Sequence, residues 1–370
     1  MQFIDLAAQQ KRIRRQLDER IKKVLDHGQY ILGPEIRELE EKLAAWVGMP
    51  FAVSVASGTD ALLMPLMAEK VGPGDAVFSP TFTFIATAGA IALTGATPVF
   101  VDSDPVTFNI DPADLEKAIQ KTVAAKKLVP KGIIPVDLFG QPADYRAIQA
   151  IADTYGLFVL EDAAQSFGAS QDSKKAGALA GIGATSFFPA KPLGCYGDGG
   201  MIFAAEKNVA ERLLSIRVHG QGADKYTNVR VGINGRMDSL QAAVLLAKLE
   251  IFDEEIGLRQ EVAARYDRLL AGTVKTPTVR PGNVSAWAQY SVQHPRRDEI
   301  IQKLREHNIP TAIYYPIPLH LQGAFADLGY KENDFPVAEK AAREIFSLPM
   351  HPYLGAAEQE SIAKIICQCG

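Results

Sequence analysis

The sequence is short of cysteine and has no long hydrophobic run. Its 370 residues include three cysteines, an odd number that argues against a disulfide framework. Cys367 and Cys369 have no third and fourth partner at zinc-like spacing, so we expect no metal site. No window approaches about 18 continuous apolar residues, and Met1–Leu6 lacks the basic and apolar regions of a leader. We therefore expect a cytoplasmic protein that does not enter a membrane.

Positive charge is also scarcer than a nucleic-acid-binding protein would need. The formal net charge is -4 and the pI is near 5.9, so we predict no nucleic-acid partner. The signatures G-x-x-x-x-G-K-[ST], H-E-x-x-H and G-x-S-x-G are absent, which argues against the commonest nucleotide hydrolases, metalloproteases and serine hydrolases.

Apolar runs of strand length alternate with helical patterns between residues 51 and 204. This alternation is typical of an α/β domain built on a buried, mostly parallel sheet. The strands are expected at 51–55, 75–84, 97–101, 131–139, 157–160, 184–188 and 200–204. The helices between them are expected at 61–69, 86–93, 111–119 and 144–155. Two helices separated by a loop at 28–34 should precede the sheet within 7–47.

The remainder of the chain reads as a smaller α+β domain. A helix is expected at 208–218, followed by a helical pattern from 237 to 270 that is long enough to connect two domains. Beyond a connector at 271–282, strands are expected at 287–293 and 311–315, and helices at 298–307, 336–345 and 357–366. Because 370 residues favour two domains, we divide the chain into residues 1–250 and 251–370.

A small, glycine-containing corner at Ser57–Asp60 opens the helix expected at 61–69. The first N–H groups of a helix lack internal partners and carry the positive end of its dipole, which suits a phosphate. Capping by Ser57, Thr59 or Asp60 explains the same residues without any ligand.

Two charged residues lie next to expected strands, where they could serve a buried site. Asp162 follows the apolar strand at 157–160, and a carboxylate there needs a cationic partner. Lys191 lies between an aromatic run and the glycine-rich turn at 194–200. A structural ion pair or helix cap for Asp162, and a surface position for Lys191, are the simpler alternatives.

Together with the aromatic residues Phe82 and Phe84, these residues fit pyridoxal phosphate (PLP). PLP needs a lysine for a Schiff base, an acid at the pyridine nitrogen, a ring to stack on and a phosphate cradle. The acid must be Asp or Glu, because only a protonated pyridine withdraws electrons strongly from the substrate carbon. We therefore expect PLP as the cofactor and Lys191 as the catalytic residue.

The whole chain also resembles the DegT/DnrJ/EryC1/StrS family of PLP-dependent nucleotide-sugar aminotransferases. The resemblance is carried by motifs in the same order: Gly28–Glu35 (GQYILGPE), Ser57–Ala61 (SGTDA), Glu161–Gln165 (EDAAQ), Ser186–Lys191 (SFFPAK) and Gly232–Met237 (GINGRM). It implies a fold-type I, aspartate aminotransferase-like subunit, and a homodimer with active sites at the subunit interface.

The resemblance also implies roles for individual residues. Lys191 would hold the cofactor covalently, Asp162 would pair with the pyridine nitrogen, and Gln165 would approach the 3-hydroxyl group. Phe84 would stack on the ring. The phosphate would be held by Gly58, Thr59 and Ser186, with Asn234 reaching across from the other subunit. Dehydratases of the family carry His in place of the lysine, so Lys191 favours transamination.

Within the family, the chain resembles enzymes that aminate C3 of UDP-linked 2-acetamido-2-deoxy-3-oxo-glucuronate in bacterial O-antigen and lipopolysaccharide biosynthesis. L-glutamate would be the amino donor. The implied substrate-binding residues are Arg236, Tyr314, Tyr315 and His320. Arg236 suits a sugar carboxylate because a guanidinium grips two oxygens, although a surface or interface ion pair is the alternative. Amination at C4, or a PLP-binding regulator without turnover, remain open.

Overall fold

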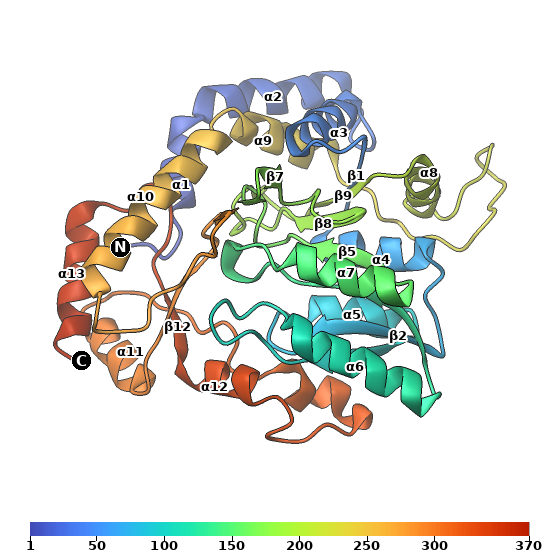
Figure 1. Ribbon diagram of the computed structural model, residues 1–370. Helices are drawn as coiled ribbons and strands as arrows, with labels where there is room; N and C mark the ends of the chain where they lie inside the picture. Colours follow the sequence, from blue (N-terminus) through green and yellow to red (C-terminus); the bar gives the residue numbers. More distant parts are fainter. Residues whose placement is uncertain (370) are drawn as a thin grey trace.

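A seven-stranded sheet forms the centre of the computed structural model, which describes residues 1–369 (Figure 1). Its strands are β1 (Phe51–Val55), β2 (Asp75–Pro80), β3 (Thr97–Val101), β4 (Val129–Ile133), β5 (Phe158–Asp162), β8 (Ile182–Ser186) and β9 (Gly200–Ala204). The spatial order is β1-β9-β8-β5-β4-β2-β3. Only β9 pairs antiparallel with its neighbours, and the other pairs are parallel. The prediction of a mostly parallel sheet is confirmed.

Helices cover both faces of this sheet. The helices, some of which pack in a second core away from this sheet, are α1 (Leu6–Arg12), α2 (Arg14–His27), α3 (Pro34–Val47), α4 (Gly58–Ala68), α5 (Ala86–Leu93), α6 (Pro112–Ala125), α7 (Tyr145–Tyr155), α8 (Lys207–Ile216), α9 (Ser239–Leu249), α10 (Phe252–Leu270), α11 (Arg297–Glu306), α12 (Pro336–Glu344) and α13 (Ala356–Cys367). In Figure 1, α6 and α7 lie in front of the sheet, and α4 and α5 lie behind it.

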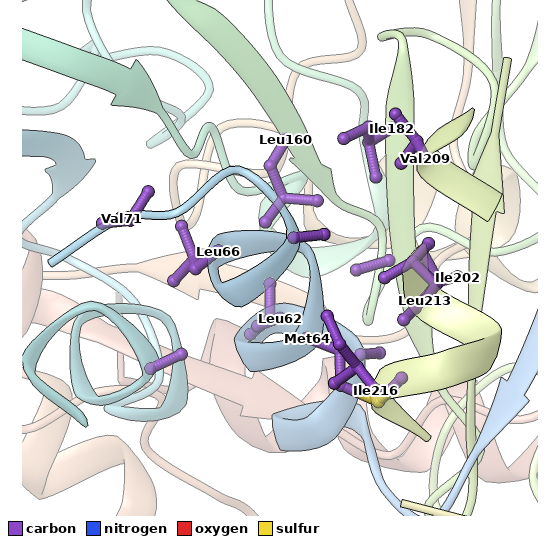
Figure 2. Close-up of a cluster of buried hydrophobic side chains, with 14 of the residues drawn as sticks. Leu62, Met64, Leu66, Val71, Leu160, Ile182, Ile202, Val209, Leu213 and Ile216 are labelled. Carbon is purple, nitrogen blue, oxygen red and sulfur yellow. The ribbon is translucent and has the colours of Figure 1, made fainter. Parts of the chain in front are cut away.

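The two faces of the sheet bury different side chains of the same strands because successive strand residues point in opposite directions. Leu160 of β5 packs with Leu62 and Leu66 of α4, and with α8 residues, in the cluster drawn in Figure 2. Val159, the residue before it, belongs to the cluster that includes α6 and α7. Burying one such aliphatic side chain contributes roughly 1.5–3 kcal/mol, so these faces fix the register of the strands that carry the site.

Beyond α10, a second core forms around a two-stranded antiparallel sheet of β11 (Tyr290–Gln293) and β12 (Ile345–Leu348). Tyr290 packs there against Tyr266 of α10, with ring centroids 4.8 Å apart. A small sheet is formed by β10 (Asn283–Val284), β6 (Ser170–Gln171) and β7 (Lys174–Lys175). Short 3-10 turns occupy Leu138–Gly140, Leu319–Leu321 and Gly323–Leu328. The division at residue 250 stays a prediction.

Several expected elements differ from the structure. The helical stretch at 237–270 is two helices, because Ile251 leaves helical geometry at φ -115° and ψ 2°. The strand expected at 311–315 is reduced to one bridge between Ala312 and Ser347. Prolines at 310 and 316 bracket this segment and lack the N–H groups that a ladder needs. The first helix is also divided, at Ile13.

Within residues 1–369, none of the helices combines the length and the apolar character that crossing a membrane would require.

Candidate active site

The site forms where two neighbouring strands end. Asp162 is the last residue of β5 and Ser186 the last of β8, and these strands pair in parallel. The carboxyl ends of parallel strands share one edge of the sheet, where ligands of such folds gather. The sheet therefore brings together two residues that lie 24 positions apart in the sequence.

The Asp162 carboxylate is buried and held from two sides. Thr87 of α5 donates a hydrogen bond from Oγ1 to Oδ2 at 2.8 Å, and the Ala164 N–H donates to Oδ1 at 3.2 Å. Burial raises the pKa of Asp162, while the Thr87 and Ala164 hydrogen bonds and the charge of Lys191 oppose that rise. The adjacent Glu161 has its own donors, the N–H groups of Gly177 and Leu179. Asp162 is thus the carboxylate of this pair that faces Lys191.

Lys191 sits in a closed turn between β8 and β9. Its N–H donates to the Phe188 carbonyl at 2.9 Å, and the Cys195 N–H donates to the Phe187 carbonyl at 2.8 Å. Desolvation lowers the pKa of Lys191, and the Asp162 charge pulls that pKa back up. Lys191 is therefore half-buried and under the influence of the Asp162 charge, which differs from a fully exposed surface lysine.

The N-terminus of α4 faces Ser186 at the same edge. A Cβ added to Gly58 would lie 2.6 Å from the Ser186 Cβ, so only glycine fits. The Ser57 hydroxyl accepts from the Asp60 N–H at 3.1 Å and so caps the helix. Capping by Ser57 leaves room for an anion, because Ser57 satisfies the Asp60 N–H and leaves the N–H groups of Gly58 and Thr59 without intrahelical acceptors.

Aromatic and amide groups line the opposite side. Gln165 donates from Nε2 to the Tyr315 hydroxyl at 3.2 Å and accepts from the Phe139 N–H at 2.9 Å. The rings of Phe84 and Tyr315 lie 6.2 Å apart. Phe84 remains 55% exposed, although most of its neighbours are buried, so its ring face is available to a planar ligand.

His320 does not line the site as expected. Its side chain is buried, with Nδ1 2.8 Å from the Thr81 hydroxyl oxygen and Nε2 3.3 Å from Glu339 Oε1. Both ring nitrogens are therefore occupied by protein groups, and His320 supports the 318–321 segment instead of facing a substrate. Tyr314 lies beside Tyr315, with ring centroids 5.9 Å apart, and is half-buried.

Asn234 and Arg236 lie on the segment between α8 and α9, part of which projects from the body in Figure 1. Asn234 is exposed and bridges to Val218. The Arg236 Nε is buried without a hydrogen-bond partner among residues 1–369. The neighbouring Gly235 carbonyl accepts from the Ala56 N–H at 2.9 Å, which ties this segment to the start of α4. Arg236 is thus a cation near the site with unused hydrogen-bonding capacity.

Sequence reasoning missed two buried groups, Thr87 and Asp137, that lie near Asp162. Thr87 is the only polar side chain in the otherwise apolar helix α5, and that isolation was the available signal. Asp137 accepts from the Ala143 N–H, the Tyr145 hydroxyl and the Ser166 hydroxyl. Burial, with the charge of Asp162 as a minor contribution, raises the Asp137 pKa to about 7.

The donor set at this edge of the sheet fits PLP. Among residues 1–369, the His, Cys, Asp and Glu side chains form no group that could hold a metal ion. One edge of the sheet carries the N-terminus of α4 with its close-packed Gly58, the half-buried Lys191, the buried carboxylate of Asp162 and the exposed ring of Phe84. These groups match the phosphate, aldehyde, pyridine nitrogen and ring face of that cofactor.

Comparison with known proteins agrees with this arrangement. Residues 11–367 match the DegT/DnrJ/EryC1/StrS aminotransferase family. The chain is 51% identical over 368 residues to the UDP-2-acetamido-2-deoxy-3-oxo-D-glucuronate aminotransferase of Pseudomonas aeruginosa, which covers 99% of this chain and 98% of the relative.

Solved structures give the same picture. A DegT DnrJ EryC1 StrS aminotransferase from Brucella abortus superposes with a TM-score of 0.97 at 50% identity, covering 100% of this chain and 99% of that chain. NtdA from Bacillus subtilis, solved with bound cofactor PMP, has a TM-score of 0.88 at 29% identity, covering 99% and 82%. The predicted fold class is confirmed.

Proposed function

This chain belongs to the DegT/DnrJ/EryC1/StrS aminotransferase family, and on that premise we propose that it transfers the amino group of L-glutamate to C3 of UDP-2-acetamido-2-deoxy-3-oxo-glucuronate. The cofactor would be PLP, and the pathway would be that of a bacterial surface polysaccharide such as O-antigen or lipopolysaccharide. One observation carries the proposal: the half-buried Lys191 and the buried carboxylate of Asp162 influence each other's charge at the edge of the sheet where α4 begins.

Each residue would have a distinct task. When bound, PLP supplies a carbonyl carbon that takes up an amino group and a ring that withdraws electrons from it. Lys191 would anchor the cofactor and, once released, move a proton between the substrate carbon and the cofactor carbon. Asp162 would hold the proton on the ring nitrogen, and Thr87 would keep that carboxylate oriented.

The remaining groups would bind and orient. Gly58, Thr59 and Ser186 would hold the phosphate through backbone N–H and hydroxyl donors, Gln165 would approach the 3-hydroxyl group, and Phe84 would cover the ring. Arg236 has an unpartnered Nε, which supports its role at the sugar carboxylate because a guanidinium binds both oxygens of a carboxylate. Tyr314 and Tyr315 would contact the substrate from the opposite side.

A homodimer would complete the site. The projecting 219–231 segment carries Tyr226 at 86% and Val231 at 85% exposure, and large apolar side chains this exposed favour a protein contact. Asn234 would reach the phosphate of the other subunit from the base of the same segment. We further propose that the smaller C-terminal domain begins at residue 251 and that the enzyme works in the cytoplasm.

The test is 2-oxoglutarate release from L-glutamate, measured with a panel of 3-keto and 4-keto nucleotide sugars, with and without PLP. Release with the 3-keto glucuronate alone supports the proposal. Release with a 4-keto sugar instead would overturn the assigned carbon, and PLP binding without any release would indicate a regulator. A Lys191→Ala protein that released 2-oxoglutarate at the normal rate would refute the role of Lys191.

A further inference from the structure

Lys248 is a buried ammonium that the proposed reaction does not use. It lies near the end of α9, is 1% exposed, and has no hydrogen-bond partner for Nζ among residues 1–369. Its Nζ lies over the ring of Tyr196, 4.3 Å from the centroid. An unpaired buried charge costs several kcal/mol, and a cation–π contact of this kind returns roughly 2 kcal/mol when desolvated. The cation–π contact therefore offsets only part of the free-energy cost of burying Lys248.

The charged groups that face Lys248 do not pair with it directly. Glu255 of α10 already accepts from Gln9 Nε2 at 2.8 Å and from the Tyr353 hydroxyl. Cys195 also faces Lys248, but its thiol donates to backbone carbonyls of its own loop. Desolvation lowers the Lys248 pKa to about 8, while Glu255 and Cys195 favour the charged form. The cation–π contact with the Tyr196 ring is therefore the main interaction of the Lys248 ammonium within the described residues.

A second residue of α9 holds the same tyrosine by its backbone. The Tyr196 N–H donates to Gln241 Oε1 at 2.9 Å, and Gln241 Nε2 donates to the Tyr196 carbonyl at 3.5 Å. Gln241 and Lys248 are seven residues apart, which places them on one face of the helix. One face of α9 thus contacts Tyr196 twice, with Gln241 at its backbone and Lys248 at its ring.

Tyr196 stands at the base of the loop that carries Lys191. The loop is closed by the Cys195 N–H donating to the Phe187 carbonyl, and its strands are joined by the Phe187 N–H donating to the Gly199 carbonyl, both at 2.8 Å. Gly194 allows the tight return, since a Cβ there would lie 2.5 Å from the Pro189 carbonyl oxygen. A displacement of Tyr196 would therefore be passed to the turn that aims Lys191.

We propose that Gln241 and Lys248 are positioning residues that clamp Tyr196 to α9 and so hold the Lys191 amine in its reactive orientation. The inference rests on the proposed function, because it assigns a purpose to the fixed position of Lys191. Misplacement of a reacting group by about 1 Å costs on the order of 100-fold in rate. Loosening Tyr196 at the base of the loop should therefore slow the reaction of the Lys191 amine measurably.

Two quantities are measured for each variant. The first is the rate at which borohydride fixes PLP to Lys191 at saturating PLP, determined by peptide mass spectrometry over time. The second is the Tm of the cofactor-free protein. Gln241→Met and Lys248→Met remove the polar contacts at nearly constant volume. Gln241→Glu keeps the acceptor for the Tyr196 N–H, and Lys248→Arg keeps a cation over the ring. Val262→Ala is the matched control, since it weakens the separate C-terminal core.

We expect about 10-fold slower capture in both Met variants, capture within about 2-fold of wild type in the Glu and Arg variants, and unchanged capture in Val262→Ala at a similar loss of Tm. Met variants that capture as fast as Val262→Ala at equal Tm loss would overturn the positioning role. Should Lys248→Met fail to fold, Gln241→Met decides alone. Absence of capture at Lys191 in the wild-type protein would instead refute the proposed function.

Discussion

Gly58 and Ser186 approach so closely that a Cβ on Gly58 would lie 2.6 Å from the Ser186 Cβ and 2.9 Å from its Oγ. The pair comes from the first turn of α4 and the last residue of β8, the two elements that frame the proposed phosphate cradle. A backbone held this near a hydroxyl lets N–H and O–H donors converge on one anion.

Gly58→Ala should therefore weaken PLP binding by pushing Ser186 out of place. Overpacking of this kind typically costs about 1–3 kcal/mol, which corresponds to roughly a 5- to 150-fold increase in Kd. The measurement is PLP titration of the cofactor-free protein by fluorescence. Gly89→Ala is the control, because nothing lies within 4 Å of its added Cβ and alanine favours the helix. Equal affinities of the two variants would contradict the cradle.

Thr87→Val tests the hydrogen bond to Asp162 at constant side-chain volume. The Thr87 hydroxyl stabilises the ionised carboxylate and so lowers the Asp162 pKa; its loss raises that pKa. A higher pKa means that Asp162 is protonated at higher pH, so the acid limb of the kcat profile should move to higher pH. Thr83→Val is the control, since the buried Thr83 hydroxyl has no partner among residues 1–369. The hypothesis fails if both variants keep the wild-type acid limb.

The sequence was enough to predict the residues whose chemistry is unusual for their position. A carboxylate directly after an apolar strand, as at Asp162, is a costly placement that can be recognised without coordinates. Lys191 alone is equally compatible with a surface position, so its proposed role depends on the other residues and on the family motifs. The strand at 51–55 and the helix at 86–93 coincide with β1 and α5 because both segments are predominantly apolar.

Features that depend on packing between distant segments could not be predicted. The break between α9 and α10 falls at Glu250 and Ile251, where no proline or glycine marks it. The family resemblance implies a substrate contact for His320, yet the chain turns its ring toward Thr81 and Glu339. Tyr196 gave no signal of its own, since its partners come from a helix more than 40 residues later.

Phe84→Ala should weaken PLP binding while leaving stability nearly unchanged. The ring is more than half exposed, so folding gains little from it, whereas an aromatic stack contributes roughly 0.5–1.5 kcal/mol. The expected increase in Kd is about 2- to 12-fold. PLP titration and thermal unfolding of the cofactor-free protein measure the two effects separately. Leu93→Ala removes a similarly exposed apolar side chain outside the site and should leave the Kd at the wild-type value. A Phe84→Ala protein with lower Tm and unchanged Kd would show that Phe84 serves packing.

Asp162→Asn should separate stability from catalysis. The pKa of Asp162 is raised in the folded protein, so the folded state binds its proton more tightly than the unfolded state does. Its contribution to stability is therefore lost as pH rises through the folded-state pKa, and the amide does not suffer that loss. We expect the cofactor-free Asp162→Asn protein to melt at or above the wild-type temperature at pH 8. Turnover should nevertheless fall by about 100- to 1000-fold, as expected when one preorganised electrostatic group is removed.

The same variant should change the reactivity of Lys191. The Asp162 charge raises the Lys191 pKa. Removing that charge lowers the Lys191 pKa, so a larger fraction of the amine is neutral at a given pH. In the cofactor-free protein, Lys191 of Asp162→Asn should acetylate faster with acetic anhydride at pH 7.5, as measured on its peptide by mass spectrometry. The exposed Lys174 of the same molecule provides the internal control and should react at the wild-type rate. Slower acetylation of Lys191 alone would mean that Asp162 governs access to the amine and not its charge.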